Sequence, residues 1–372
     1  MLRAITLLLL SCLAACDRPG PETIAGAASV PLNKRMGSEP AQGFARALEP
    51  RDFVFPQDHG AHPEYATEWW YFTGNLYDAN KRRFGYQLTL FRVGLESGPP
   101  ADDSDWRATQ LYMGHLAISD IEKQQHHSSE RFSRAAAGLA GATDRPLAVW
   151  LGPWSIRGGE AQPFPLKLEA STSEMEITLS LQAGTRDMVL QGERGLSQKG
   201  AEPGNASYYY SYTRLPTRGE IRIGQQCFAV SGNSWFDREW SSSALAADQA
   251  GWDWFALQLD DGSDLMFYRM RDTQGRAQRF SSGVLIKPDG SASSLSPEKV
   301  ELRPARFWTS DRGTRYPVAW HMKVPDHELD LSIEAAFDGQ EMPLSVTYWE
   351  GAVDISGSVR GVGYLELSGY SQ

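Results

Sequence analysis

The sequence predicts an all-β protein built from two antiparallel units in tandem, and three observations lead to this fold class. Two similar hairpin patterns occur in the chain, short apolar runs recur with turn residues between them, and no amphipathic helix longer than three turns can be traced. Short strands separated by Gly, Pro, Asn and Asp indicate a sandwich or a barrel. With 372 residues, the chain is long enough for two such domains with separate cores.

The two hairpins show the same order of features. Apolar and aromatic runs at 67–77 and 84–93 bracket the polar turn 78–81, and runs at 252–259 and 265–271 bracket the turn 260–263. Such runs around a short turn rich in Asp are typical of a β-hairpin. The remaining strands are expected at 108–120, 166–170, 174–183, 188–191, 208–214, 219–230, 283–287, 299–302, 319–324, 329–337, 345–355 and 360–370.

The small and polar segment 241–250 is the expected boundary between the two units. This boundary gives an N-terminal domain at 51–240 and a C-terminal domain at 241–372. Residues 16–50 are rich in Pro, Gly and Ala and lack periodicity, which is typical of a flexible linker.

The N-terminus predicts export and a lipid anchor. Arg3 precedes an apolar run at 5–10, and Leu13-Ala14-Ala15-Cys16 follows. Residues 1–15 therefore read as a cleavable signal peptide, and the tetrapeptide resembles the bacterial lipobox, in which the Cys is lipidated. Asp17 resembles an inner-membrane retention signal. We expect a lipoprotein anchored through Cys16 on the periplasmic side of the cell envelope; the alternative is a plain secretory signal.

The net charge and the cysteine content limit the binding partners and the disulfides that can be expected. Asp and Glu number 46 against 36 Lys and Arg, a net charge of −10, whereas nucleic-acid binding needs clustered cations. No nucleic-acid partner is expected. Cys227 is left without a partner once Cys12 leaves with the signal and Cys16 carries lipid, so no internal disulfide is expected. Because Cys227 lies in an apolar run, it is predicted to be buried and inert.

Carboxyl residues repeatedly stand beside tryptophan, in the segments Glu68-Trp69-Trp70, Asp237-Arg238-Glu239-Trp240, Trp252-Asp253-Trp254 and Trp349-Glu350. Alternation along a strand places Glu68 and Trp70 on one face and Trp69 and Tyr71 on the other. If 235–240 is extended, its residues divide in the same way, into Trp235, Asp237 and Glu239 on one face and Phe236, Arg238 and Trp240 on the other. Glu68, Trp70, Asp237, Glu239 and Asp253 are expected to meet at or between the barrels, near Trp240 and Trp254.

A carboxyl group among aromatic rings loses solvation, so its acid form is favoured and it can donate a proton near neutral pH. Neighbouring indole faces stabilise a developing cation. This combination suits the acid-catalysed addition of water to an isolated alkene. The candidate catalytic residues are Asp237, Asp253, Glu239 and Glu68. The candidate ligand-binding residues are Trp69, Trp70, Tyr71, Trp235, Trp240, Trp252, Trp254, Tyr348 and Glu350.

A structural alternative exists for the same residues. In this alternative the tryptophans belong to the cores, Arg238 pairs with Asp237 or Glu239, and the acids cap the barrel ends. Other chemistry lacks support, because no Gly-x-Ser-x-Gly elbow and no nucleotide-binding glycine loop occurs. His59 and His62 lack metal-binding spacing and are predicted to be solvated loop residues. No metal and no cofactor is expected.

Five segments resemble the signatures of the family that joins carotenoid 1,2-hydratases (CrtC-type) with AttH-type lipocalin-like proteins: 62–76 (HPEYATEWWYFTGNL), 232–242 (GNSWFDREWSS), 251–255 (GWDWF), 348–351 (YWEG) and 361–370 (GVGYLELSGY). The resemblance covers about residue 55 to the end and implies tandem lipocalin-like, calycin-type barrels. The bacterial lipoprotein branch often carries the label "predicted secreted hydrolase". The hydratase branch has an essential Asp, which Asp253 would match, and a His in the Asp-x-x-Trp segment, where this chain departs with Glu239.

Three functions remain open at this point. The first is an envelope lipoprotein that binds an apolar or amphipathic, lipid- or isoprenoid-like small molecule in a β-barrel cavity. The second is a hydro-lyase or hydrolase, similar to a carotenoid 1,2-hydratase, that uses Asp237 and Asp253. The third is an accessory protein of an envelope ABC transporter. A deep cavity containing Asp237 would favour the first two, and filled barrels with an exposed aromatic patch would favour the third.

Overall fold

The computed structural model describes residues 42–98, 108–160, 162–242 and 245–370. Within these ranges, regular structure consists of strands and three short 3₁₀ turns, η1 (Gln57–His59), η2 (Pro297–Lys299) and η3 (Pro325–His327). None of the helices described there is long and apolar enough to cross a bilayer. The expected signal peptide, Cys16, Asp17 and most of the expected linker lie outside the described residues. The predicted all-β fold class is confirmed.

In the described part of the chain, thirteen strands form the first sheet. They are β1 (Thr67–Tyr77), β2 (Arg83–Gly94), β3 (Gln110–Asp120), β4 (Gln125–Arg134), β5 (Ala140–Asp144), β6 (Leu147–Leu151), β7 (Trp154–Arg157), β8 (Leu166–Ser171), β9 (Met175–Leu181), β10 (Val189–Leu190), β11 (Leu196–Gln198), β12 (Ala206–Ile223) and β13 (Gln226–Ser241). The β1–β2 turn is set by Asp78, whose Oδ1 accepts hydrogen bonds from the amides of Asn80 and Arg82 at 2.8 and 2.9 Å.

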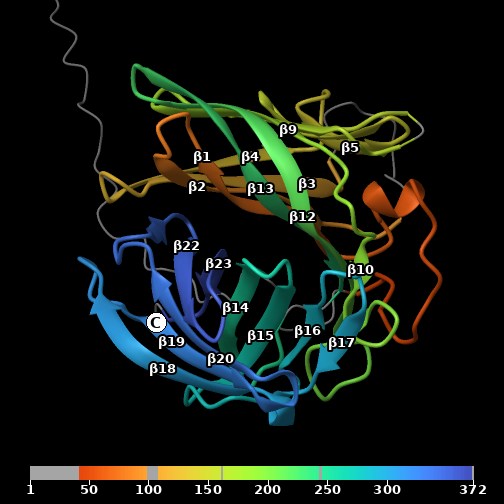
Figure 1. Ribbon diagram of the computed structural model, residues 1–372. Helices are drawn as coiled ribbons and strands as arrows, with labels where there is room; N and C mark the ends of the chain where they lie inside the picture. Colours follow the sequence, from red (N-terminus) through yellow and green to blue (C-terminus); the bar gives the residue numbers. More distant parts are fainter. Residues whose placement is uncertain (1–41, 99–107, 161, 243–244, 371–372) are drawn as a thin grey trace, which may run out of the picture.

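The first sheet runs in the order β4-β3-β2-β1-β13-β12-β9-β8-β7-β6-β5, and β10 and β11 pair with β12. All of its pairs are antiparallel. Because β6 packs against β2, β3 and β4, the path folds back on itself and nearly closes into a flattened barrel, the upper unit in Figure 1.

Ten strands form the second sheet within the described residues. They are β14 (Gln249–Leu259), β15 (Asp264–Asp272), β16 (Ser282–Ile286), β17 (Ala292–Leu295), β18 (Glu301–Thr309), β19 (Arg315–Val324), β20 (Leu329–Ala335), β21 (Glu341–Pro343), β22 (Thr347–Gly357) and β23 (Gly361–Leu367). Their order is β17-β16-β15-β14-β23-β22-β20-β19-β18, with β21 on β22. This antiparallel sheet also curls into a nearly closed barrel, the lower unit in Figure 1.

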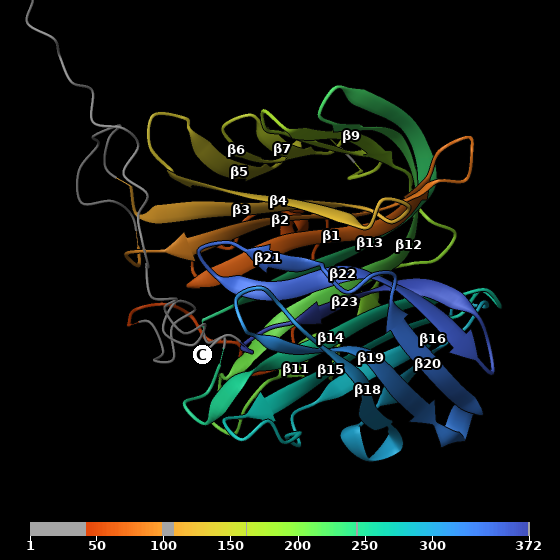
Figure 2. The ribbon, with the colours of Figure 1, turned by 90° about the vertical axis from the view of Figure 1, so that its left-hand side faces the viewer.

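The two barrels pack face to face. Figure 2 shows β22 and β23 beneath β1 and β13, and the contacts include β1 with β23 and β2 with β22. At Gly85, a Cβ atom would lie only 3.1 Å from the Cβ of Ala352 and 3.2 Å from the hydroxyl of Tyr364. The absence of a side chain at this glycine therefore lets the two sheets approach closely.

Alternation along the strands separates three apolar clusters. Trp70, Phe72 and Trp240 fill the first barrel, and Phe255, Trp320 and Trp349 belong to the core of the second barrel. A third cluster, containing Tyr71, Trp235, Trp254 and Tyr268, lies between the barrels. The interiors of both barrels are therefore packed with side chains, and the interface between them has a core of its own.

The prediction for Cys227 was wrong, because this thiol is exposed. The expected strand 219–230 is interrupted by a turn at Gly224, whose φ of +58° is readily adopted by glycine. The chain reverses there, so β12 ends at Ile223, β13 begins at Gln226, and Cys227 lies next to the hairpin turn.

Candidate active site between the barrels

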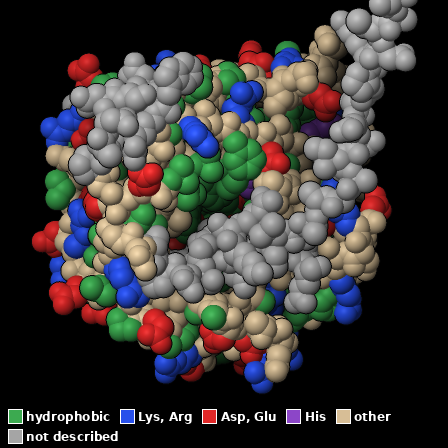
Figure 3. Space-filling view, turned by 180° about the vertical axis from the view of Figure 1, so that it is seen from behind, with side chains coloured by type: hydrophobic (Ala, Val, Ile, Leu, Met, Phe, Trp, Pro, Cys, Tyr) green, Lys and Arg blue, Asp and Glu red, His purple; other side chains and the backbone are tan. Residues whose placement is uncertain are grey.

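A cavity lined by several buried acidic groups lies between the two barrels. It has a volume of about 410 Å³, within the range of small-molecule pockets. Most of its walls are outward-facing side chains of β1, β2, β3, β12 and β13 from the first barrel and of β14, β15, β22 and β23 from the second. Phe132, which is 46% exposed, also lines it. Figure 3 shows a hollow on the rear face with hydrophobic side chains gathered around it.

This location corrects the expectation of a cavity inside a β-barrel. The barrel interiors are occupied by aromatic and aliphatic side chains, and the space for a ligand lies where the outer faces of two curved sheets do not fully meet. Of the sequence-predicted residues, the cavity wall contains Asp237, Glu239, Glu68, Trp69, Tyr71, Trp252, Trp254, Tyr348 and Glu350. Trp235 belongs to the apolar cluster between the barrels.

Asp237 is held by three neutral hydrogen-bond donors. Tyr209 donates to Oδ2 at 2.5 Å, Ser211 donates to Oδ1 at 2.5 Å, and the indole of Trp235 donates to Oδ1 at 2.7 Å. Burial raises the pKa of Asp237 to about 7, although the three hydrogen bonds oppose the shift. No ion pair to Asp237 occurs among the described residues, so this carboxyl group exchanges its proton near neutral pH.

Glu239, two residues further along the same face, has a different environment. Ser207 donates a hydrogen bond to its Oε1, and the ammonium of Lys199 lies 3.3 Å from the same oxygen. Burial acts to lower the pKa of Lys199, but the charge and hydrogen bond of Glu239, together with Tyr268 and Asp237, outweigh it and the pKa is raised. Lys199 also lies 3.9 Å from the centroid of the Tyr268 ring. Glu239 is therefore part of an ion pair at the cavity wall.

The second barrel contributes two further carboxyl groups. Tyr71 donates a hydrogen bond of 2.5 Å to Oε1 of Glu350, and Trp252 and Ser368 donate to Oε1 of Glu366 at 2.9 and 2.6 Å. Burial raises the pKa of Glu350 well above its usual value and that of Glu366 to about 7. Carboxyl groups that retain protons near neutral pH thus line both walls of the cavity.

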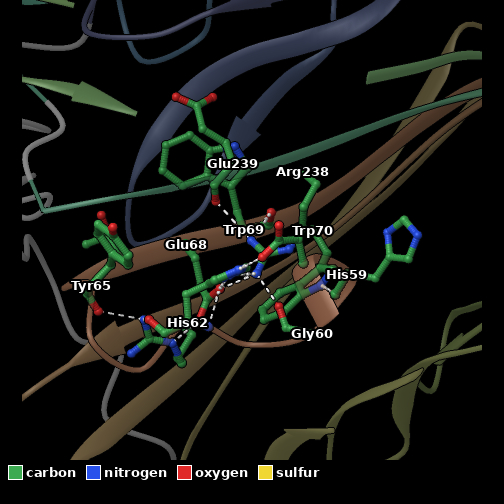
Figure 4. A network of polar contacts seen from close by, with 12 residues as sticks. His59, Gly60, His62, Tyr65, Glu68, Trp69, Trp70, Arg238 and Glu239 are labelled. Atoms are coloured by element: carbon green, nitrogen blue, oxygen red, sulfur yellow. Dashed lines mark hydrogen bonds and ion pairs between the residues drawn. The ribbon is translucent and has the colours of Figure 1, made fainter. Parts of the chain in front are cut away.

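Glu68 reaches the cavity edge, but it belongs to an ion network inside the first barrel (Figure 4). Arg92 and Arg238 pair with its two oxygens, and the backbone amide of His62 donates to both at 3.0 and 3.1 Å. Burial alone would raise the pKa of Glu68, but Arg238 and then Arg92 hold it well below its usual range. Glu68 is a permanently ionised member of a buried network.

This network also explains Trp70 and Trp240 and corrects the prediction for His59 and His62. Both histidines are buried, with exposures of 1% and 5%, because the segment that carries them packs into the first barrel. His62 stacks on Trp240 with ring centroids 3.8 Å apart, and the indole of Trp70 donates to the carbonyl of His59 at 2.8 Å. Neither tryptophan lines the cavity.

Asp253 lies on the opposite face of β14 from Trp252 and Trp254 and is absent from the cavity wall. Its Oδ2 is 2.7 Å from Arg269, its Oδ1 is 3.2 Å from Arg271, and Tyr370 donates to Oδ1 at 2.7 Å. The five residues expected to meet are therefore divided: Asp237 and Glu239 line the cavity, Glu68 and Trp70 belong to the first barrel, and Asp253 is buried with guanidinium groups of the second barrel.

Several cavity residues were not among the candidates, notably Glu366, Lys199, His115, Tyr209, Tyr268 and Met270. For Glu366 a signal was present, since alternation along 361–367 places it on the same face as Tyr364. For Lys199 no local pattern indicated a site, because it follows the very short β11. In the part of the chain that the structure describes, no group of three or more His, Cys, Asp or Glu side chains could hold a metal ion.

Comparisons with known proteins agree on the fold. A family model described as AttH-like matches residues 46–370. An AttH-type protein of Nitrosomonas europaea is 31% identical, with a TM-score of 0.77 over 88% of this chain and 100% of that chain. Kievitone hydratase of Nectria haematococca is 15% identical, with a TM-score of 0.65 over 88% and 98%. CghA, solved with Sch210972, is 12% identical, with a TM-score of 0.53 over 89% and 97%. No curated protein matches the chain.

Proposed function

The chain belongs to the AttH-like family, and from that premise we propose that the cavity between its barrels is the active site of a hydro-lyase. The proposed substrate is an apolar, unsaturated small molecule to which water is added. One protein with the same fold is named a hydratase, and this name agrees with the proposal. The chemistry itself is argued here from the side chains of the cavity.

The observation that carries the proposal is the environment of Asp237. Its side chain is buried in a cavity lined by aromatic rings, and its pKa of about 7 lets it gain and lose a proton at neutral pH. Retaining a desolvated carboxyl group without a cationic partner costs folding free energy, and such groups concentrate at functional sites. Asp237 is thus suited to general acid–base catalysis.

Hydration of an alkene requires a proton at one carbon and water at the other. Protonation uses the π electrons to form a C–H bond and leaves a carbocation, and Trp254 and Tyr71 in the cavity wall supply aromatic rings that can stabilise it. The oxygen of water then forms the C–O bond and releases a proton to a carboxylate. Asp237 is the proposed proton-transfer group, and the mostly apolar wall excludes bulk water that would quench the cation.

The test uses acyclic isoprenoids, namely geraniol, squalene and lycopene, incubated with the full chain in water labelled with heavy oxygen. Mass spectrometry is expected to detect a product that has gained one labelled water. Asp237→Asn is expected to reduce that turnover by about 100-fold or more, while binding, measured by quenching of tryptophan fluorescence, is retained.

Asp253→Asn is the matched control, since it changes a buried carboxyl outside the cavity. It is expected to lower stability and to leave turnover per folded molecule unchanged. Turnover that is lost in Asp253→Asn and kept in Asp237→Asn would overturn the assignment.

A second candidate function is binding without turnover, supported by the apolar part of the wall, which includes Phe91, Met113 and Met270. Tight binding of these probes without incorporation of labelled oxygen would favour it. An ABC-transporter accessory role receives less support, because a deep cavity containing Asp237 favours the small-molecule alternatives.

We further propose that Cys16 carries lipid and anchors the protein to the periplasmic side of a membrane, the inner membrane being indicated by Asp17. The support is the sequence 13–16 after an apolar run. Cys16→Ser is expected to move the protein from the membrane fraction to the soluble fraction and to abolish labelling by radioactive palmitate. Unchanged membrane retention of this variant would rule out the anchor.

A further inference from the structure

The wall contributed by the second barrel contains two acidic side chains that face each other across a strand pair. Glu350 on β22 and Glu366 on β23 are direct partners in the antiparallel register, and both line the cavity. Side chains at such positions have Cβ atoms about 5 Å apart, and like charges there are destabilising. The pair is stable only if at least one of the two carboxyl groups retains its proton.

The contacts of Glu350 indicate which group holds that proton. Its side chain is fully buried. Oε1 accepts a hydrogen bond from Tyr71, whereas Oε2 has no hydrogen-bond partner among the described residues. A buried carboxylate oxygen without a partner is costly, and a proton on Oε2 removes that cost in a side chain that lines the cavity.

No positive charge contacts Glu350 in the described structure. The titratable groups around it are Tyr71 of β1, Tyr348 of its own strand, and Tyr364 and Glu366 of β23. His115 of β3 contacts Tyr348 at 2.8 Å, and burial lowers the pKa of this histidine to about 3, so it is neutral. Burial and the neighbouring Glu366 both favour the acid form of Glu350.

Asp237 on the facing wall holds its proton less firmly, because burial raises its pKa only to about 7, whereas the pKa of Glu350 is raised well above its usual value. The oxygens of Asp237 accept hydrogen bonds from Tyr209, Ser211 and Trp235, and each of these donors stabilises the ionised form. Tyr71 connects the two acids, since it is the cross-strand neighbour of Asp237 and donates to Glu350. The two carboxyl groups therefore approach one cavity from opposite barrels, one set up to hold a proton and the other to accept one.

We propose that Glu350 is the proton donor of the hydration and that Asp237 is its base, an inference that rests on the proposed function. The O–H bond of Glu350 breaks as the alkene π electrons form the new C–H bond, leaving a carboxylate and a carbocation. Water, the co-reactant, forms the C–O bond, and the proton that it loses goes to the Asp237 carboxylate. Transfer of this proton back to Glu350, directly or through solvent, restores the starting state.

A test that needs no substrate is an infrared titration of the protonated carboxyl C=O bands of the full-length protein. At pH 8, a band is expected to persist in the wild type and to be absent in Glu350→Gln. Glu366→Gln is expected to lower the pH at which that band disappears, because the neighbouring negative charge is removed. Glu334→Gln, an exposed acid on β20, is the control and leaves the band in place. Absence of any protonated carboxyl band in the wild type at pH 8 would overturn the inference.

The kinetic test uses geraniol in labelled water. Glu350→Gln is expected to lower kcat by about 100-fold or more, and Glu366→Gln is expected to shift the alkaline limb of the kcat profile to lower pH. If Asp237→Asn abolishes turnover and Glu350→Gln does not, the inference fails and the proposed function stands. If the wild type hydrates none of the isoprenoid probes, the proposed function fails on that assay, and the infrared result reports separately on the proton of Glu350.

Discussion

The two faces of one strand pair, β1 with β13, hold two acidic clusters of opposite character. On the inner face, Glu68 lies among the guanidiniums of Arg92 and Arg238. On the outer face, Asp237 lies among the neutral donors Tyr209, Ser211 and Trp235. Both clusters are buried and both adjoin indoles, yet the pKa of Glu68 is lowered and the pKa of Asp237 is raised to about 7.

The difference shows that the charged or neutral partner, and not burial or neighbouring aromatic rings, determines whether a buried carboxyl group is ionised. Cations keep Glu68 ionised and make it part of the packing that closes the first barrel. Neutral donors compensate only part of the desolvation of Asp237, so its proton remains exchangeable. The sequence around the two residues looks alike, although strand alternation places their side chains on opposite faces and therefore in different environments.

The largest expected effect is on the inner face. Arg238→Met removes one of the two cations that pair with Glu68 and also the contact of the guanidinium with the Trp70 ring, which lies 4.0 Å away. Breaking a buried ion pair in this way is expected to cost about 5 kcal/mol of unfolding free energy. Denaturant unfolding monitored by tryptophan fluorescence measures it. Arg218→Met, at an exposed position of the neighbouring strand, is the control, and a loss below about 1 kcal/mol in Arg238→Met would contradict the assignment.

The next effect concerns the free energy of unfolding, whose pH dependence is expected to have opposite signs for the acids on the two faces. Because the pKa of Asp237 rises from 3.8 to about 7 on folding, the unfolded chain releases this proton first, and wild-type stability falls as pH rises from about 4 to 7. Asp237→Asn lacks this loss. It is expected to be more stable than the wild type at pH 8, by on the order of 4 kcal/mol for about three pKa units, and equal to it at pH 4.

Glu68→Gln is the counterpart for the inner face. The pKa of Glu68 is lowered on folding, so its contribution is present above its unfolded pKa and is lost only as pH falls through the lower folded value. This variant is expected to be less stable than the wild type at pH 7 and at pH 8. Unfolding curves for Asp237→Asn at pH 4 and pH 8 and for Glu68→Gln at pH 7 and pH 8 check the comparison, and a Glu68→Gln variant more stable than the wild type at pH 8 would contradict it.

Much of the fold followed from the sequence, because apolar alternation marks a half-buried strand. The expected strand 67–77 coincides with β1, and the family resemblance to AttH-type proteins is confirmed. β4 was not predicted, because its residues, such as His126 and Ser128, are polar, and this half-buried strand contacts β21 and β6 only in the folded protein. The turn at Gly224 was missed, although the polar Gln225 and Gln226 follow it, because the apolar residues further along the segment made 219–230 look like one strand.

The site was less predictable. Alternation in the sequence shows which side chains share a face of a strand, but it does not show which residues pack against that face. Alternation correctly grouped Asp237 with Glu239, but only the packing of two sheets brings Glu350 from the second barrel to Tyr71 of the first. The same rule separates Asp253 from Trp252 and Trp254 on adjacent positions of β14. That separation makes Asp253 an ion-pair partner of Arg269 and Arg271.

The smallest expected effect concerns a single hydrogen bond to Asp237. Tyr209 donates to Oδ2 at 2.5 Å, and this bond stabilises the ionised carboxylate, so it lowers the pKa of Asp237. Tyr209→Phe removes the donor and is expected to raise the midpoint of the Asp237 infrared titration by about one unit, since a hydrogen bond to a charged group contributes about 1.5 kcal/mol. Tyr210→Phe is the matched control, because the next residue of β12 points into the first barrel and contacts His59 at 2.6 Å. A midpoint that moves equally in both variants, or that falls in Tyr209→Phe, would show that neutral donors on the outer face do not set the protonation of Asp237.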